Sequence, residues 1–285
     1  QRTSVAAGAM IRADGSGGNG GKVVLWSDGA TRVHGTVSAR GSAAGGAVET
    51  SGHVLDVDGI AVNASGAKGK NGTWLLDPYD IEVVAGGTAG ADDVKAASAG
   101  AATGVTRVAP ATLTAAGTDV VLQAQHDLTV TDALDTAGSV HAQANNDITV
   151  NAQVSAGGDL DFRAGNAFTL GANGSLKTGN YIDVDANQVT LAGTIAGNGQ
   201  LPVLTLTSAD PGRAINIGTG TGAADALVLD AAALRRLSAN LYELNVGNSA
   251  HTGTVTVAGA LSAATNVVLE HAGDIHIGAP VDLSA

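Results

Sequence analysis

The sequence predicts an all-β fold, a parallel β-helix (β-solenoid) with turns of about 20 residues. Similar segments recur at a fixed spacing, apolar residues alternate within each segment, and only 2% of the 285 residues are aromatic. A chain so poor in rings cannot fill a wide globular core. Short turns stacked on one another share a narrow aliphatic core instead, and this length corresponds to roughly 13 or 14 of them.

Four recurring segments set the period. Their equivalent apolar residues are Leu128, Ile148, Phe168 and Val189, at spacings of 20, 20 and 21. The alternation within each segment is typical of strands with one buried face, and Gly, Asn and Asp supply the turns. An antiparallel β-sandwich is the alternative, but its hairpins would recur about every 8–12 residues.

Two stretches interrupt this rhythm and predict short helices. Asp230 is a candidate N-cap for a helix near 230–239, and Pro110 can begin one helical turn. We expect one continuous β-helix fragment over 1–285, cut from a longer protein. Its expected parts are a motif-rich region at 1–84, a loop with a short helical excursion at 85–116, regular turns at 117–200, and further turns with the helix at 201–285.

Charge and composition argue against several classes of protein. The net charge is −12, and the 14 Lys and Arg form no basic patch of the kind that a nucleic-acid binder needs. No apolar run approaches the length of a membrane span, and the absence of Cys removes disulfides and thiolate sites. We therefore expect no nucleic-acid partner, no membrane span, no cofactor and no metal.

The first hundred residues carry distinctive motifs at 20–28, 37–41, 45–52 and 71–81. This series closely resembles the large exoproteins of bacterial two-partner secretion, the filamentous haemagglutinin-like adhesins. Gly-Thr-Trp-Leu-Leu-Asp-Pro at 72–78 is the most specific match, and the resemblance extends more generally over nearly the whole chain. The core and turn residues that the motifs suggest are Trp26, Trp74, Leu75, Leu76, Asp77 and Pro78.

The resemblance implies a right-handed β-helical shaft that is exported through a dedicated outer-membrane transporter. It implies a secreted or cell-surface protein that acts in adhesion, aggregation or a biofilm matrix. Host-cell or matrix receptors, glycans, and self-association into fibres are the other partners we expect. Three Asn-X-Ser/Thr sequences, at Asn63, Asn71 and Asn173, are candidate glycosylation sites, since some relatives in this family carry sugars at such positions.

The period also predicts a structural polar ladder. It places one column of side chains just before the inward strands: His126, Asn146, Asn166 and Asn187. Hydrogen bonds along such a column would satisfy the amides and resist slippage of the register; unrelated surface turns are the alternative. The glycine runs at 17–21 and 45–46 are expected to form tight turns, because they lack the Gly-Lys-Ser/Thr of a phosphate loop.

Three pairs of side chains could carry chemistry: Asp161 with Asp183, His251 with His271, and Asp77 with Asp80. They could bridge Ca²⁺, hold a metal, or serve in acid–base catalysis, respectively. Because no further ligands or partners are evident, we expect instead a solvated pair, two partly exposed histidines and a turn.

We therefore expect a structural and adhesive shaft and not an enzyme. A β-helical carbohydrate- or receptor-binding module is the alternative. A polysaccharide-acting enzyme is disfavoured, because seven aromatic residues in 285 offer few platforms for sugar rings.

Overall fold

The computed structural model is a β-solenoid of about 11 turns built mostly from parallel strands, with two short helices among the described residues, 1–67, 70–87, 104–218 and 226–284. The predicted parallel β-helix is confirmed. The chain divides into two compact units, Gln1–Ala144 with Val154–Gly157, and Asn145–Gln153 with Gly158–Ala285. Each unit is described by itself.

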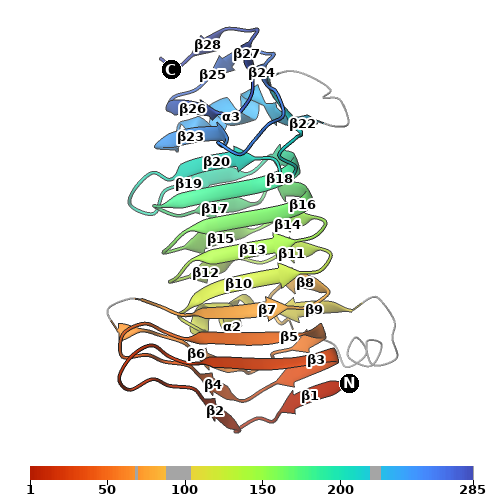
Figure 1. Ribbon diagram of the computed structural model, residues 1–285, viewed down its shortest axis with the longest axis vertical. Coiled ribbons are helices and arrows are strands. Elements are labelled where there is room, and N and C mark those ends of the chain that lie inside the picture. Colours follow the sequence, from red (N-terminus) through yellow and green to blue (C-terminus); the bar gives the residue numbers. More distant parts are fainter. Residues whose placement is uncertain (68–69, 88–103, 219–225, 285) are drawn as a thin grey trace. The chain divides into compact units, whose positions relative to one another are not determined.

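In the first unit, equivalent strands of successive turns pair in parallel (Figure 1). Its elements are β1 (Arg2–Val5), β2 (Met10–Arg12), β3 (Lys22–Val33), β4 (Thr36–Ser38), β5 (Ala47–Asp56), β6 (Ala61–Asn63), β7 (Thr73–Asp77), β8 (Asp80–Val83), β9 (Val105–Val108), α2 (Pro110–Ala115), β10 (Asp119–Ala124), β11 (Leu128–Val130), β12 (Leu134–Thr136), β13 (Val140–Ala144) and β15 (Gln153–Ala156). A larger sheet holds β3, β5, β7 and β10, and a smaller one holds β2, β4 and β6.

One column of inward side chains shows how the first unit forms its core. Val23 pairs with Val48, Val48 with Trp74, Trp74 with Val120, and Val120 with Val140. All five are buried, because the alternation of the strands turns them to the same side. Val120 and Val140 are one predicted period apart in the sequence, and the partners in each earlier pair are farther apart. Turns longer than the predicted period explain why there are fewer turns than expected.

The stretch predicted as loop and short helix, 85–116, contains helix α2 but also a strand that the prediction missed. Within it, residues 88–103 lie outside the described part. Strand β9 pairs in parallel with β8, and the buried hydroxyl of Thr106 accepts a hydrogen bond from the Leu55 N–H of β5 at 2.9 Å. A strand later in the sequence thus satisfies a backbone donor of an earlier turn. Helix α2 begins at Pro110, as predicted.

The glycine runs do more than form turns. Gly46 and Gly72 stand directly before β5 and β7, and neither is among the glycines with positive φ. A Cβ on Gly46 would overlap the Gly21 carbonyl oxygen, and one on Gly72 would overlap that of Gly46. We call Gly46 and Gly72, which are aligned on successive turns, the glycine column. They are required by the close approach of successive backbones, not by an unusual backbone conformation.

The second unit repeats the same architecture. Its elements are β14 (Ile148–Val150), β16 (Leu160–Leu170), β17 (Ser175–Lys177), β18 (Tyr181–Leu191), β19 (Thr194–Ala196), β20 (Val203–Thr207), β21 (Ala214–Gly218), β22 (Ala226–Asp230), α3 (Ala231–Ser238), β23 (Glu243–Gly247), β24 (Val255–Val257), β25 (Leu261–Ser262), β26 (Asn266–Glu270), β27 (Ile275–Ile277) and β28 (Val281–Asp282). Ile148 pairs with Phe168, and Phe168 with Val189, in the predicted register. In Figure 1, β16, β18, β20 and β23 of this unit follow one another in that order.

Helix α3 confirms the predicted excursion near 230–239. The Asp230 carboxylate accepts a hydrogen bond from the Ala233 N–H at 2.7 Å, which is the expected N-cap. Leu234 and Leu237 are buried beneath the helix, and the Arg236 guanidinium donates to the Leu191 carbonyl. The helix is therefore fixed to the solenoid by both its apolar face and its last turn.

Within the described residues, the structure contains no helix with the length and apolar character needed to cross a membrane.

Candidate functional site

Three rings stack where the first unit turns from one face to the next. His53 lies in β5, Tyr79 lies between β7 and β8, and His126 lies between β10 and β11. Their backbones are joined, since the Tyr79 N–H donates to the His53 carbonyl at 3.1 Å and the His126 N–H to the Tyr79 carbonyl at 2.9 Å. Ring centroids are 5.0 and 5.5 Å apart, and the second pair is nearly parallel. Regular stacking of the turns thus sets these rings in one column.

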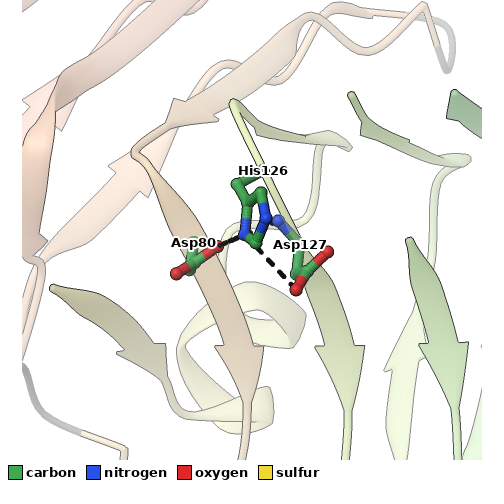
Figure 2. Close-up of side chains that lie close together, drawn as sticks. All are labelled: Asp80, His126 and Asp127. Atoms are coloured by element: carbon green, nitrogen blue, oxygen red, sulfur yellow. Dashed lines mark hydrogen bonds and ion pairs between the residues drawn. The ribbon is translucent and has the colours of Figure 1, made fainter. Parts of the chain in front are cut away.

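Two carboxylates converge on the last of these rings, as Figure 2 shows. His126 Nδ1 lies 3.1 Å from Asp80 Oδ1 and 3.3 Å from Asp127 Oδ2. The Asp127 N–H donates to the same Asp80 oxygen at 2.9 Å, and the Ile81 N–H donates to the Asp127 carbonyl at 3.0 Å. The Asp80 carboxylate therefore accepts hydrogen bonds from both a side chain and the backbone of the next turn. We call Asp80, His126 and Asp127 the aspartate clasp.

The clasp is also where the described part of the chain brings three metal-ligand side chains together, with their donor atoms within 4.8 Å of one another. The ring and the Asp127 carboxylate are nearly half exposed, and Asp80 is more enclosed. A histidine and two carboxylates can ligate a divalent cation. The hydrogen bonds within the clasp account for the arrangement by themselves, so we assign it a structural role.

A second clasp of the same design occurs in the second unit. Asp147 Oδ1 accepts from Asn166 Nδ2 at 2.7 Å and from the Ala167 N–H at 3.1 Å. Asp80 and Asp147 both stand at or just before the start of an inward strand. Sequence reasoning missed this role, although Asp127 and Asp147 open the similar segments Asp-Leu-Thr-Val and Asp-Ile-Thr-Val, one period apart.

The residues of the predicted polar ladder bond along the stack, in part through backbone groups and through side chains outside the ladder. His126 contacts Asp80 in the first unit. In the second unit, the Asn166 N–H donates to the Asn146 carbonyl at 2.9 Å. Asn187 Nδ2 donates to the Gly165 carbonyl, and Asn187 Oδ1 accepts from Ser208 Oγ and the Asp210 N–H.

The Gly-Thr-Trp-Leu-Leu-Asp-Pro motif lies in β7 and the corner after it. Trp74 and Leu76 are fully buried, Pro78 is buried and Leu75 is half-buried. Trp74 Nε1 donates to Thr50 Oγ1 at 3.1 Å, which satisfies the indole in the core. The motif therefore encodes one core layer of the solenoid.

Two other motif residues need separate comment. Asp77 ends β7, where burial, followed by the repulsion of Glu49, raises the pKa of its carboxyl, while a hydrogen bond from Gln125 acts in the opposite direction. Trp26 is not a core residue, because it lies on the outward side of β3 and is 53% exposed. The segment 22–27 is apolar on both sides, so alternation alone could not place this ring.

The candidate glycosylation asparagines differ in accessibility. Asn63 and Asn173 are exposed, whereas Asn71 is half-buried. Asn63 Oδ1 accepts from the Ser65 N–H at 3.1 Å and from Ser65 Oγ at 2.8 Å, a local turn within the acceptor sequence. Attachment of sugar stays a prediction.

The remaining pairs lie on adjacent turns of the second unit, as predicted. Asp161 pairs with Asp183, and burial, more than the charge of Asp161, raises the pKa of Asp183. The rings of His251 and His271 are 5.1 Å apart and nearly perpendicular. The prediction that both histidines are partly exposed is wrong for His251, which is only 1% exposed, and this burial lowers its pKa. Neither pair belongs to a group of three metal-ligand side chains among the described residues.

Comparison with known proteins adds no assignment: no family model, curated protein or solved structure matches the chain. The class that the geometry defines is a β-solenoid whose corners are joined by polar clasps.

Proposed function

We propose that the chain is a structural and adhesive segment of a secreted bacterial exoprotein of the two-partner secretion type. The observation that carries the proposal is the in-register stacking of parallel strands in each unit. Every turn is bonded to its neighbours through its backbone and shares their aliphatic core, so a pulling or bending load is distributed over many bonds. This is the property that a shaft requires.

The motif residues support the same proposal. Trp74 and Leu76, which carry the resemblance to filamentous haemagglutinin-like adhesins, lie inside the stack and not at a surface site. A motif with this role encodes solenoid turns, which is what the shaft of such an exoprotein would contain. The partners we propose are an outer-membrane transporter during export, host-cell or matrix receptors or glycans afterwards, and further copies of the chain.

A test of this function measures shape and adhesion on the same purified chain. We expect elongated particles by negative-stain electron microscopy, and attachment of protein-coated beads to cells or to one another. Beads coated with heat-unfolded chain are the control for nonspecific stickiness. Globular particles, or equal attachment by folded and unfolded chain, would contradict the proposal.

That the chain is not an enzyme remains a prediction. Release of reducing ends from acidic polysaccharides by the purified chain would overturn it.

A further inference from the structure

Two of the three tyrosines of the chain lie beside one surface hollow in the second unit. Tyr181, Leu201 and Tyr242 are 56%, 51% and 63% exposed and lie together around it, whereas exposed apolar side chains are usually scattered singly. The hollow has a volume of about 580 Å³, and its other lining residues are Gly179, Asn180, Gln200 and Val203. We call it the tyrosine groove.

Strand register fixes Tyr181 on this surface, and a backbone hydrogen bond places Tyr242 near it. Ile182 and Val184 of β18 point into the core, so the alternation turns Tyr181 outward. Tyr181 pairs with Val203 of the next turn, and the Tyr242 N–H donates to the Pro202 carbonyl of that same turn. The two tyrosines therefore flank one intervening turn, and their backbones are about 10 Å apart, or two strand spacings.

Polar side chains also line the groove beside these rings. Among the described residues, the side chains of Asn180, Gln200, Tyr181 and Tyr242 take part in no hydrogen bond that would occupy them. The groove thus combines flat apolar ring faces with free amide and hydroxyl groups. A sugar ring needs both, because it presents C–H groups on its faces and hydroxyls at its edge.

The charge around the groove favours neutral sugars over anionic ones. None of its lining residues is basic. Three acidic groups stand beside it: Asp159 accepts from the Tyr181 N–H at 3.4 Å, Asp183 is the next outward residue of β18, and Glu243 follows Tyr242. The cation near Asp183 is Arg163, which forms an ion pair with Asp161 at 3.2 Å. Sulfated or carboxylated glycans would be repelled by these carboxylates.

We propose that the tyrosine groove binds a neutral oligosaccharide, with Tyr181 and Tyr242 as ring platforms and Asn180 and Gln200 as hydrogen-bonding groups. The inference rests on the adhesive role proposed above, to which it gives a ligand class. It does not depend on the export route.

Calorimetric titration of the full chain with neutral oligosaccharides tests the proposal, using cellohexaose, chitohexaose, mannohexaose and xylohexaose in turn, with a heparin oligosaccharide as the charged probe. We expect at least one neutral probe to bind and the heparin probe to bind more weakly. Tyr181→Ala and Tyr242→Ala should each weaken binding about tenfold or more. Tyr181→Phe should retain most of it, because the ring face remains.

Trp26→Ala is the matched control, since it removes an exposed ring from the first unit and should leave binding unchanged. Thermal melts of each variant identify any that fail to fold, and both tyrosines are exposed enough for their replacement to be tolerated. The proposal is overturned if no neutral probe binds, if the tyrosine variants bind as well as the parent, or if the heparin probe binds more tightly. Failure of binding with intact bead attachment would reject the groove and leave the adhesive function standing.

Discussion

Two corners of the first unit join successive turns in opposite ways. At the glycine column, backbones approach so closely that Gly46 and Gly72 leave no space for a Cβ. At the aspartate clasp, the Asp80 side chain crosses to the next turn and accepts from His126 and from the Asp127 N–H. One corner requires the absence of a side chain, and the other requires a particular acceptor. The glycine column should therefore be the less tolerant of substitution.

The largest effect is expected at the glycine column. Gly72→Ala would force a methyl group into the Gly46 carbonyl oxygen, and we expect a loss of about 1–3 kcal/mol of unfolding free energy, at the upper end of that range. Gly17→Ala is the control, because a Cβ there meets nothing within 4 Å and the residue is not among those with positive φ. Urea denaturation of both variants measures the difference. Equal losses would show that space at this corner is not limiting.

A smaller effect is expected at the clasp. Asp80→Ala leaves the Asp127 N–H without its acceptor and removes the nearer of the two carboxylates from the His126 ring, and should cost about 2 kcal/mol. Asp80→Asn retains one acceptor oxygen and should lose less. Asp135→Ala, at an exposed position of the same unit, should be nearly neutral in the same denaturation experiment. If Asp80→Ala were equally neutral, the clasp would contribute nothing to the stability of the fold.

Replacing the His126 donor by an asparagine should change the stability least at this corner. His126→Asn converts the clasp to the form seen at Asp147, where Asn166 is the donor, and should change stability by less than about 0.5 kcal/mol. His126→Ala and Asn166→Ala should each cost about 1 kcal/mol, because one hydrogen bond is lost. A large loss from His126→Asn, measured by the same urea denaturation, would mean that the ring stack with Tyr79 contributes more than the hydrogen bond.

The buried His251 makes the stability of the second unit depend on pH. Burial lowers the pKa of His251 in the folded chain, so the unfolded chain takes up the proton first as the pH falls. The stability associated with the neutral ring is therefore present above about pH 6.5 and is lost as the pH falls through the folded pKa. Melting temperatures between about pH 8 and pH 5 should fall less in His251→Phe than in the parent. The exposed His276→Asn should follow the parent, and a parental slope in His251→Phe would contradict the prediction.

Features with a local or periodic signal could be predicted from the sequence. Leu128, Ile148 and Phe168 recur at equal spacing, and all three are fully buried. Asp230 is a typical N-cap residue, and the leucines after it recur at helical spacing. Together they predict a helix, which α3 confirms. Tyr181 could have been placed outward by the same alternation, since Ile182 is inward.

Features set by distant contacts could not be predicted. Strand β9 is defined by its pairing with β8 and by the Thr106–Leu55 hydrogen bond, neither of which leaves a pattern within 105–108. Glycine can serve either a turn or a close backbone approach, and the sequence does not distinguish the two, so it predicts only turns for the runs at 17–21 and 45–46. The acceptor role of Asp80 depends on His126, a residue far along the chain that only folding brings near.

Between Leu204 and its partner Leu244 the chain forms β21, β22 and helix α3, yet β20 and β23 keep an unbroken register. Since β21 and β22 belong to the stacked sheet with β24 and β27, extra chain can lengthen a turn without disturbing the paired rows on either side. The turn at Gly199, where a Cβ would meet nothing within 4 Å, offers a comparable place for an insertion. A foreign epitope grafted there would be displayed on a scaffold whose assembly does not depend on it.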